Sequence, residues 1–295
     1  MTRKMSDYDQ TQLVAIHAWK SPALGWFGRA MEEISRRVDL TAQKVLDVPG
    51  VGFVLEKGFG GLVSVLNDAA IWSVRPDAII EDFHKHGHGE VNAIADIRGV
   101  MLKDVDETIG YLAAKYKGIA LAEGAATGSA GIFGIPADIV ALLALNLRAI
   151  GEYATYCGFD VSEQSERLFA LNVLGLASSP SDASKQLAMA QLAKIAKEVA
   201  RKKTWKQLEE HAFVQILQKI AQGLGIRLTK AKLAEAIPIV GGLVGAGFNA
   251  YYTSRVCDAA YFLYRERFLA EKYGEDLIKG VGKEPADFEP DFSKD

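Results

Sequence analysis

The sequence predicts an all-α protein, a single-domain multi-helix bundle with glycine-rich central helices. Apolar residues recur with helical spacing along the whole chain, and Gly, Pro or Asp/Ser-rich breaks separate the segments. Patterns typical of strands are almost absent. The chain has 295 residues, of which 49% are hydrophobic and 24% are charged, so it can bury a sizeable core.

The N-terminal half supplies a series of predicted helices. The first covers Asp7 to Lys20 and ends before Pro22, which would interrupt it. A second helix starts near Ala23, a third covers Val63 to Trp72, and the stretch Ile94 to Lys117 supports one or two more.

The central stretch, Gly124 to Asp160, carries the most information. Glycines lead to Pro136, and a long apolar helix follows that contains few polar residues. Polar groups in so apolar a helix need partners or water, so this stretch is the place to look for a site. Asp138 falls in the first helical turn, where the helix dipole favours a carboxylate.

Spacing sorts the other polar residues of this helix. Asn146 and Arg148 are two residues apart and cannot share a face, whereas Arg148 and Glu152 can pair at i,i+4.

The C-terminal half begins with a short helix predicted over Ser162 to Leu176. The next segment, Ala183 to Lys203, is amphipathic, with a basic side opposite its apolar side. Ala236 to Ser254 contains no charged residue but four glycines and a proline, so a buried core helix, a membrane span and an interfacial segment all remain open. We expect one domain over 1–280 and a disordered acidic tail over 281–295.

Charge is unevenly distributed along the chain. The formal net charge is −3, yet Lys185 to Lys232 contains eleven Lys and Arg against three Glu. This asymmetry indicates a face that binds an anionic membrane surface or an acidic partner in a membrane-protein complex, or else a solvated helical face. The basic residues expected to bind are Lys194, Lys197, Arg201, Lys202, Lys203 and Lys206.

Several other classes of partner and site are disfavoured. The basic residues lack the interleaved aromatic pattern of nucleic-acid modules, so no nucleic acid is predicted. The N-terminus shows no signal-peptide pattern, which predicts a cytoplasmic protein, possibly peripheral to the inner face of the cell membrane. The two cysteines, Cys157 and Cys257, lie in apolar contexts and are expected to be buried thiols.

The one cluster with metal-ligand character is a run of alternating histidines, His84, His86 and His88. It matches no closed zinc spacing, so a solvated loop is the preferred interpretation and neither metal nor cofactor is predicted. Serine hydrolysis has less support, because no G-x-S-x-G motif is present.

The run G-x-x-G-I-P-A-D-I…L-N-L-R-A-I…Y-x-G-F-D, from Gly131 to Asp160, resembles the signature of the bacterial EcsC family. The later run I-P-x-V-G-G-x-V-G-A-G-F-N, Ile237 to Asn249, and the pair Arg255 and Asp258 fit the same pattern. The resemblance implies an intracellular bacterial protein of helical fold, in a family named for a member encoded beside an ABC transporter. It implies no established reaction.

These patterns support three hypotheses about function. The first is a non-enzymatic helical protein that associates peripherally with the membrane. The second is a hydrolase or metal-dependent enzyme that uses Asp138, Asn249 and Asp258, and the third is a protein that binds a lipid or apolar ligand. If the glycine-rich helices pack together, a central polar network should form from these residues: Asp138, Asn146, Arg148, Asn249, Arg255 and Asp258.

Overall fold

The computed structural model describes residues 4–20, 74–128, 135–177, 192 and 247–278. Within these ranges the ordered elements are helices, and no strand occurs among them, which confirms the all-α fold class. The predicted helices near 23–34, 63–72 and 183–203 lie outside the described residues, apart from residue 192. So do most of 236–254 and the predicted tail.

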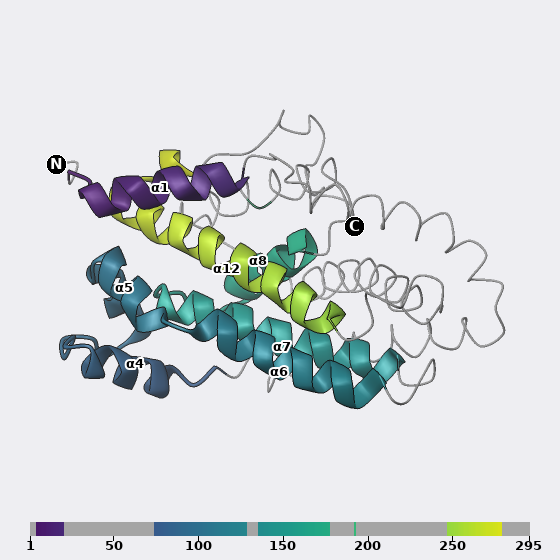
Figure 1. Cartoon of the computed structure of the whole chain (residues 1–295). Coiled ribbons are helices and arrows are strands. Elements are labelled where there is room, and N and C mark those ends of the chain that lie inside the picture. Colours follow the sequence, from purple (N-terminus) through teal and green to yellow (C-terminus); the bar gives the residue numbers. More distant parts are fainter. Residues whose placement is uncertain (1–3, 21–73, 129–134, 178–191, 193–246, 279–295) are drawn as a thin grey trace, which may run out of the picture.

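In chain order, the elements are as follows, with the labels of Figure 1. They are α1 (Asp7–Lys20), α4 (Pro76–Lys85), the 3-10 helix η1 (Ile94–Gly99), α5 (Leu102–Ile109), α6 (Leu112–Gly128), α7 (Ile135–Tyr156), α8 (Gln164–Ala177), α12 (Phe248–Tyr273) and the 3-10 helix η4 (Glu275–Leu277).

Several predicted boundaries hold. The first helix has the predicted bounds, and α7 begins beside the predicted proline. The stretch 94–117 contains more breaks than periodicity suggested, since it divides into η1, α5 and the start of α6. Gly110, with φ 49°, ends α5, and this conformation is open to glycine and strained for other residues.

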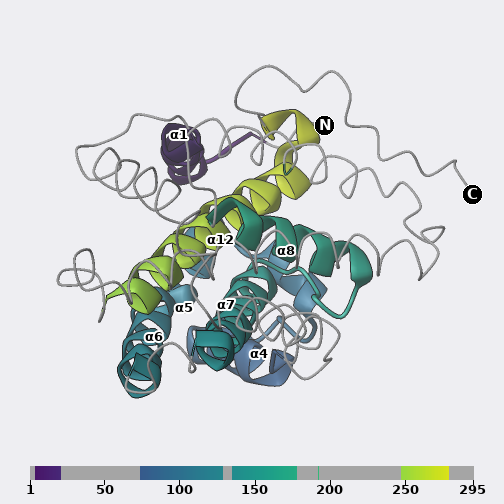
Figure 2. The ribbon, with the colours of Figure 1, turned by 90° about the vertical axis from the view of Figure 1, so that its right-hand side faces the viewer.

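Helix α12 lies at the centre of the described bundle. In two views at right angles, α1 flanks it on one side, with α6 and α7 on the other (Figures 1 and 2). Eight consecutive residues, from Leu263 to Ala270, are each no more than 5% exposed. Eight residues exceed two helical turns, so this part of α12 is covered on every side.

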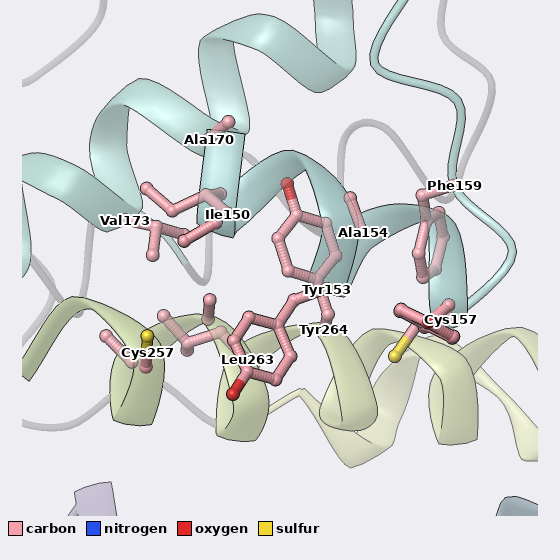
Figure 3. Close-up of a cluster of buried hydrophobic side chains, with 14 of the residues drawn as sticks. Ile150, Tyr153, Ala154, Cys157, Phe159, Ala170, Val173, Cys257, Leu263 and Tyr264 are labelled. Carbon is pink, nitrogen blue, oxygen red and sulfur yellow. The ribbon is translucent and has the colours of Figure 1, made fainter. Parts of the chain in front are cut away.

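The apolar core lies where α7, α8 and α12 meet (Figure 3). Ile150 and Ala154 from α7, Val173 from α8 and Cys257 from α12 are all fully buried. Burying an aliphatic side chain of this size stabilises the fold by about 1.5–3 kcal/mol, so this cluster is a major source of stability. Both cysteines are buried free thiols, as predicted.

The buried stretch of α12 includes three successive charged residues, and each is paired with a different element. Arg265 donates to the Asp106 carboxylate of α5 at 2.6 Å and to Gln12 of α1 at 2.8 Å. The Asp106 carboxylate also accepts a hydrogen bond from the Tyr8 hydroxyl at 2.7 Å. Burial raises the pKa of Asp106, and Arg265, which lowers it, offsets only part of that effect.

The next residue, Glu266, binds the last residue of α1. Lys20 donates to both carboxylate oxygens of Glu266 at 2.7 Å, and both side chains are 2% exposed. These polar contacts add to the packing of the partly buried Tyr8, Leu13 and Trp19, which also hold α1 against the core.

Arg267 pairs with Glu166 of α8 through two parallel hydrogen bonds of 2.6 Å. Its guanidinium also lies 4.1 Å from the ring centroid of Phe159 and 4.4 Å from that of Phe169. Burial acts to lower the pKa of Arg267, but the Glu166 carboxylate raises it overall. Arg267 therefore stays charged although it is buried.

Gly158 lies in the turn that follows α7 and leads the chain toward α8. Its φ of 81° lies in the left-handed region, and a Cβ there would lie 2.6 Å from the Arg98 side chain. Both conditions require glycine at this position.

Replacing Arg267 by Met should destabilise the protein by about 3–5 kcal/mol, because Glu166 would keep a buried charge without its cation. Urea unfolding of the variant and wild type measures the difference. Lys103→Met is the control, since Lys103 forms an exposed pair with Glu107 at 3.7 Å and its loss should cost less than about 1 kcal/mol. The double variant Arg267→Met, Glu166→Leu should regain much of the loss. Equal effects of the two single variants would contradict this account.

Candidate functional site

Two of the polar residues predicted to form a central network meet where α6 ends and α7 and α12 begin. Asn249 of α12 donates from Nδ2 to Oδ1 of Asp138 on α7 at 3.0 Å. Asp138 is 5% exposed and Asn249 is 2% exposed. The hydrogen bond therefore lies inside the bundle and joins two helices through residues that are 111 positions apart in the sequence.

Helix α6 approaches this pair through a glycine. A Cβ on Gly124 would lie 3.1 Å from Nδ2 of Asn249 and 3.3 Å from its Cβ. The absent side chain thus lets α6 pack directly on the Asn249 amide. Glycine permits this close approach of two helices because it has no side chain to separate them.

Glu123, the neighbour of Gly124 on α6, brings a second carboxyl to the cluster. It is half-buried, and its pKa is raised first by burial and then by the like charge of Asp138. The Glu123 carboxyl therefore keeps its proton to a higher pH than an ordinary Glu does. Such behaviour is shared by acid–base sites and by buried structural clusters.

A second polar contact joins the same two helices further along. Asn146 of α7 is fully buried and donates to the Thr253 hydroxyl at 3.2 Å and to the Leu142 carbonyl at 2.7 Å. Thr253 is one turn beyond Asn249 on α12, so the two contacts hold α7 and α12 in register. With this amide orientation, Oδ1 of Asn146 has no hydrogen-bond partner among the described residues.

Arg148, Arg255 and Asp258 lie elsewhere, which corrects the six-residue central network. Arg148 pairs with Glu152 at 3.7 Å, as the i,i+4 spacing predicts, and its side chain is 49% exposed. Arg255 is half-buried over the Tyr251 ring, and Asp258 is exposed.

The reason is helical geometry. Nine residues separate Asn249 from Asp258, which is about two and a half turns and about 13 Å along a straight helix. The two side chains therefore point to opposite sides of α12. Asp138, Asn249 and Asp258 do not converge on one site.

The histidine run, predicted to lie in a solvated loop, begins inside a helix and continues into the turn that follows it. His84 lies in the last turn of α4, and its Nε2 is 2.7 Å from the Val91 carbonyl. Nδ1 of His86 is 2.8 Å from the Asp82 carbonyl, and Nδ1 of His88 is 3.2 Å from the Glu90 carboxylate. Within the described ranges, no group of three or more His, Cys, Asp or Glu has metal-binding geometry.

The predicted basic binding residues, Lys194 to Lys206, lie outside the described residues, so their role stays a prediction. Among the helices that are described, none combines the length and the apolar composition needed to cross a bilayer.

Sequence reasoning missed the charged pairs of α12. A signal was present, because Arg265, Glu266 and Arg267 are consecutive within a helix flanked by apolar residues. Successive helical residues point about 100° apart, so three in a row cannot all face solvent on a helix that packs on both sides. Their partners carried no local signal, since they lie from 101 to 253 residues away.

Comparison with known proteins assigns the chain to a family. The chain matches the EcsC protein family over residues 10–269. It belongs to the EcsC family. It is 26% identical over 280 residues to "Uncharacterized protein YdbA" of Bacillus subtilis (strain 168), a match that covers 93% of this chain and 97% of that protein. It is 28% identical over 184 residues to "Protein EcsC" of the same organism, covering 61% of this chain and 70% of that protein. No solved structure matches the chain.

The EcsC family match confirms the resemblance carried by the central motifs. Its span, 10–269, includes both the Asp138–Asn249 contact and the buried charges of α12. The domain boundary at 280 stays a prediction.

Asn249→Ala should lower the free energy of unfolding by about 1–3 kcal/mol, because it removes a buried amide donor from Asp138 and the surface on which Gly124 packs. Asp258→Ala is the matched control on the same helix, because Asp258 is exposed and interacts electrostatically with Lys117 and Arg255, so its loss should change stability by less than about 1 kcal/mol. Thermal and urea unfolding measure both. An unchanged or raised midpoint for Asn249→Ala would favour the catalytic hypothesis instead.

Glu123→Gln should raise the melting temperature at neutral and alkaline pH. The pKa of Glu123 is raised in the folded state, so its contribution to stability is fully present below the ordinary value of 4.5 and is lost as the pH rises through the folded pKa. The gain from Gln should therefore shrink as the pH is lowered toward 4.5.

The same substitution in an Asp138→Asn background is the control, and its gain should be smaller because the like charge is gone. Melting curves of the four proteins across this pH range decide the matter. A gain that is constant with pH would rule out the proposed coupling.

Proposed function

We propose that this EcsC family member is a non-enzymatic helical protein that associates peripherally with the cytoplasmic face of the bacterial membrane. The association is made with anionic headgroups or with a membrane-protein complex. One observation carries the proposal: Lys185 to Lys232 contains eleven Lys and Arg against three Glu, in a chain whose formal net charge is −3. Such a segment is attracted to an anionic surface, and each cation near it contributes about 1 kcal/mol.

The central polar residues support a structural role rather than a catalytic one. Asp138, Asn146 and Asn249 are each no more than 5% exposed, and they bind across the interface between α7 and α12. Hydrogen-bonded polar groups that are sealed from solvent hold helices in register, whereas a catalytic group must reach a substrate.

The residues expected to form an active site under the enzymatic alternative do not come together. Asp258 points away from Asn249, and each of the three histidines places a ring nitrogen against an atom of its own segment. The feature that still favours acid–base chemistry is Glu123 beside Asp138. A role in binding a lipid or apolar ligand stays a prediction, with no described contact in its favour.

Reversing four of the basic residues, Lys194→Glu, Lys197→Glu, Arg201→Glu and Lys202→Glu, should move the protein from the membrane fraction to the supernatant. Each cation near an anionic surface contributes about 1 kcal/mol, so losing four should weaken binding by about 4 kcal/mol. Co-sedimentation with anionic vesicles at low salt measures the effect.

The control reverses four exposed cations of the described surface, Lys4, Arg75, Lys85 and Lys103, which makes the same change in net charge. This variant should stay bound. Undiminished vesicle binding by the first variant, or equal release of both, would remove the electrostatic basis of the proposal.

A further inference from the structure

Large apolar side chains are exposed on the outer side of α6. Ile119 is 38% exposed and Leu121 is 51% exposed. Ala114, Gly118 and Ala122 are also exposed, and at helical spacing they form the stripe between these two side chains. We call the surface formed by Ala114, Lys115, Gly118, Ile119, Leu121 and Ala122 the α6 outer face. No acidic residue occurs in α6 before Glu123.

Cations border this face on the side of α7. The side chains of Lys115 and Arg148 are 53% and 49% exposed, and they share one carboxylate, that of Glu152, at 2.9 and 3.7 Å. Glu152 is only 11% exposed, so its charge is turned inward while both cations reach solvent. This border therefore carries an excess of one positive charge.

The side of α12 has the same ratio of charges with a different exposure, because Asp258 is exposed whereas Lys117 and Arg255 are half-buried. Lys117 on α6 and Arg255 on α12 both interact electrostatically with one carboxylate, that of Asp258. Two cations again outnumber one acid. The α6 outer face is thus an exposed apolar surface with a positive excess on each border.

We propose that the α6 outer face enters the headgroup layer of an anionic lipid bilayer. This inference rests on the proposed function and names the surface that makes the contact. Lys115 lies one turn before Ile119, and Lys117 lies one turn before Leu121. Lysine side chains can keep their ammonium groups among lipid phosphates while neighbouring apolar side chains enter the acyl boundary.

Charge complementarity selects the bilayer over a second copy of the chain. In a two-fold symmetric dimer built on this face, the cations of one copy would lie close to those of the other, and like charges in contact oppose association. An anionic bilayer offers negative charge on both borders at once and an apolar layer between them.

The first experiment attaches an environment-sensitive fluorophore to Leu121→Cys in the full chain. Cys157 and Cys257 are both fully buried, so the label goes to the introduced thiol. The emission should shift to the blue with vesicles of phosphatidylcholine and phosphatidylglycerol, but not with phosphatidylcholine alone. Val14→Cys is the matched control, because Val14 is 69% exposed on α1, on the other side of α12 (Figures 1 and 2), and its label should not respond.

The second experiment measures vesicle affinity of the double variant Ile119→Asp, Leu121→Asp. Its affinity should fall by at least about tenfold, since two apolar contacts are lost and two negative charges are added. Val14→Asp, Met101→Asp is the control, with both sites more than 60% exposed, and it should keep most of the affinity. Unchanged thermal midpoints show that both variants fold.

The outcomes separate this inference from the proposed function. If wild type binds anionic vesicles but the label at 121 is silent or the aspartates leave affinity unchanged, the inference is wrong and the proposed function stands. If wild type does not bind anionic vesicles at all, the inference is wrong, and the proposed function is left only with association through a membrane-protein complex. A change of oligomeric state in the aspartate variant, with vesicle binding intact, would instead assign the face to a second copy.

Discussion

The described fold depends on how α12 keeps three charged residues inside the protein. Burying an ion without a partner costs several kcal/mol, so each position must be met by an opposite charge with good geometry. Arg265, Glu266 and Arg267 point in three directions and find their partners on α5, α1 and α8. A helix that must satisfy three such requirements at once admits few arrangements of its neighbours. The pairs therefore serve mainly to specify the packing, while the apolar core supplies most of the stability.

Local pattern was enough to predict the helices but not their neighbours. Asp7–Lys20 was predicted with its observed bounds, because Pro22 follows it and because its apolar spacing is regular. The ion pair between Lys20 and Glu266 could not be predicted, since the two residues are 246 positions apart and no local pattern around either one indicates its partner. Helical periodicity says that a face is buried, and it does not say against what.

The candidate site shows both what sequence reasoning can achieve and where it fails. Asp138, Asn146 and Asn249 were predicted to need partners because they interrupt apolar helices, and the structure supplies those partners across α7 and α12. Asp258 was grouped with them on the expectation that the glycine-rich helices pack together. The nine residues that separate it from Asn249 place it on the opposite side of a straight helix, so helical geometry by itself excludes Asp258 from this site.

Charge has two separate uses in this fold, and the separation bears on function. Inside, the three charges of α12 are each matched by an opposite partner, which leaves them no net attraction for a distant surface. Outside, Lys115 and Arg148 share a single inward-facing carboxylate, so positive charge remains available beside exposed Ile119 and Leu121. Because the buried charges cancel in pairs, they do not counteract the modest excess of positive charge at the surface. Membrane affinity and fold stability then depend on different residues, and a substitution on the α6 outer face can alter the first while leaving the second intact.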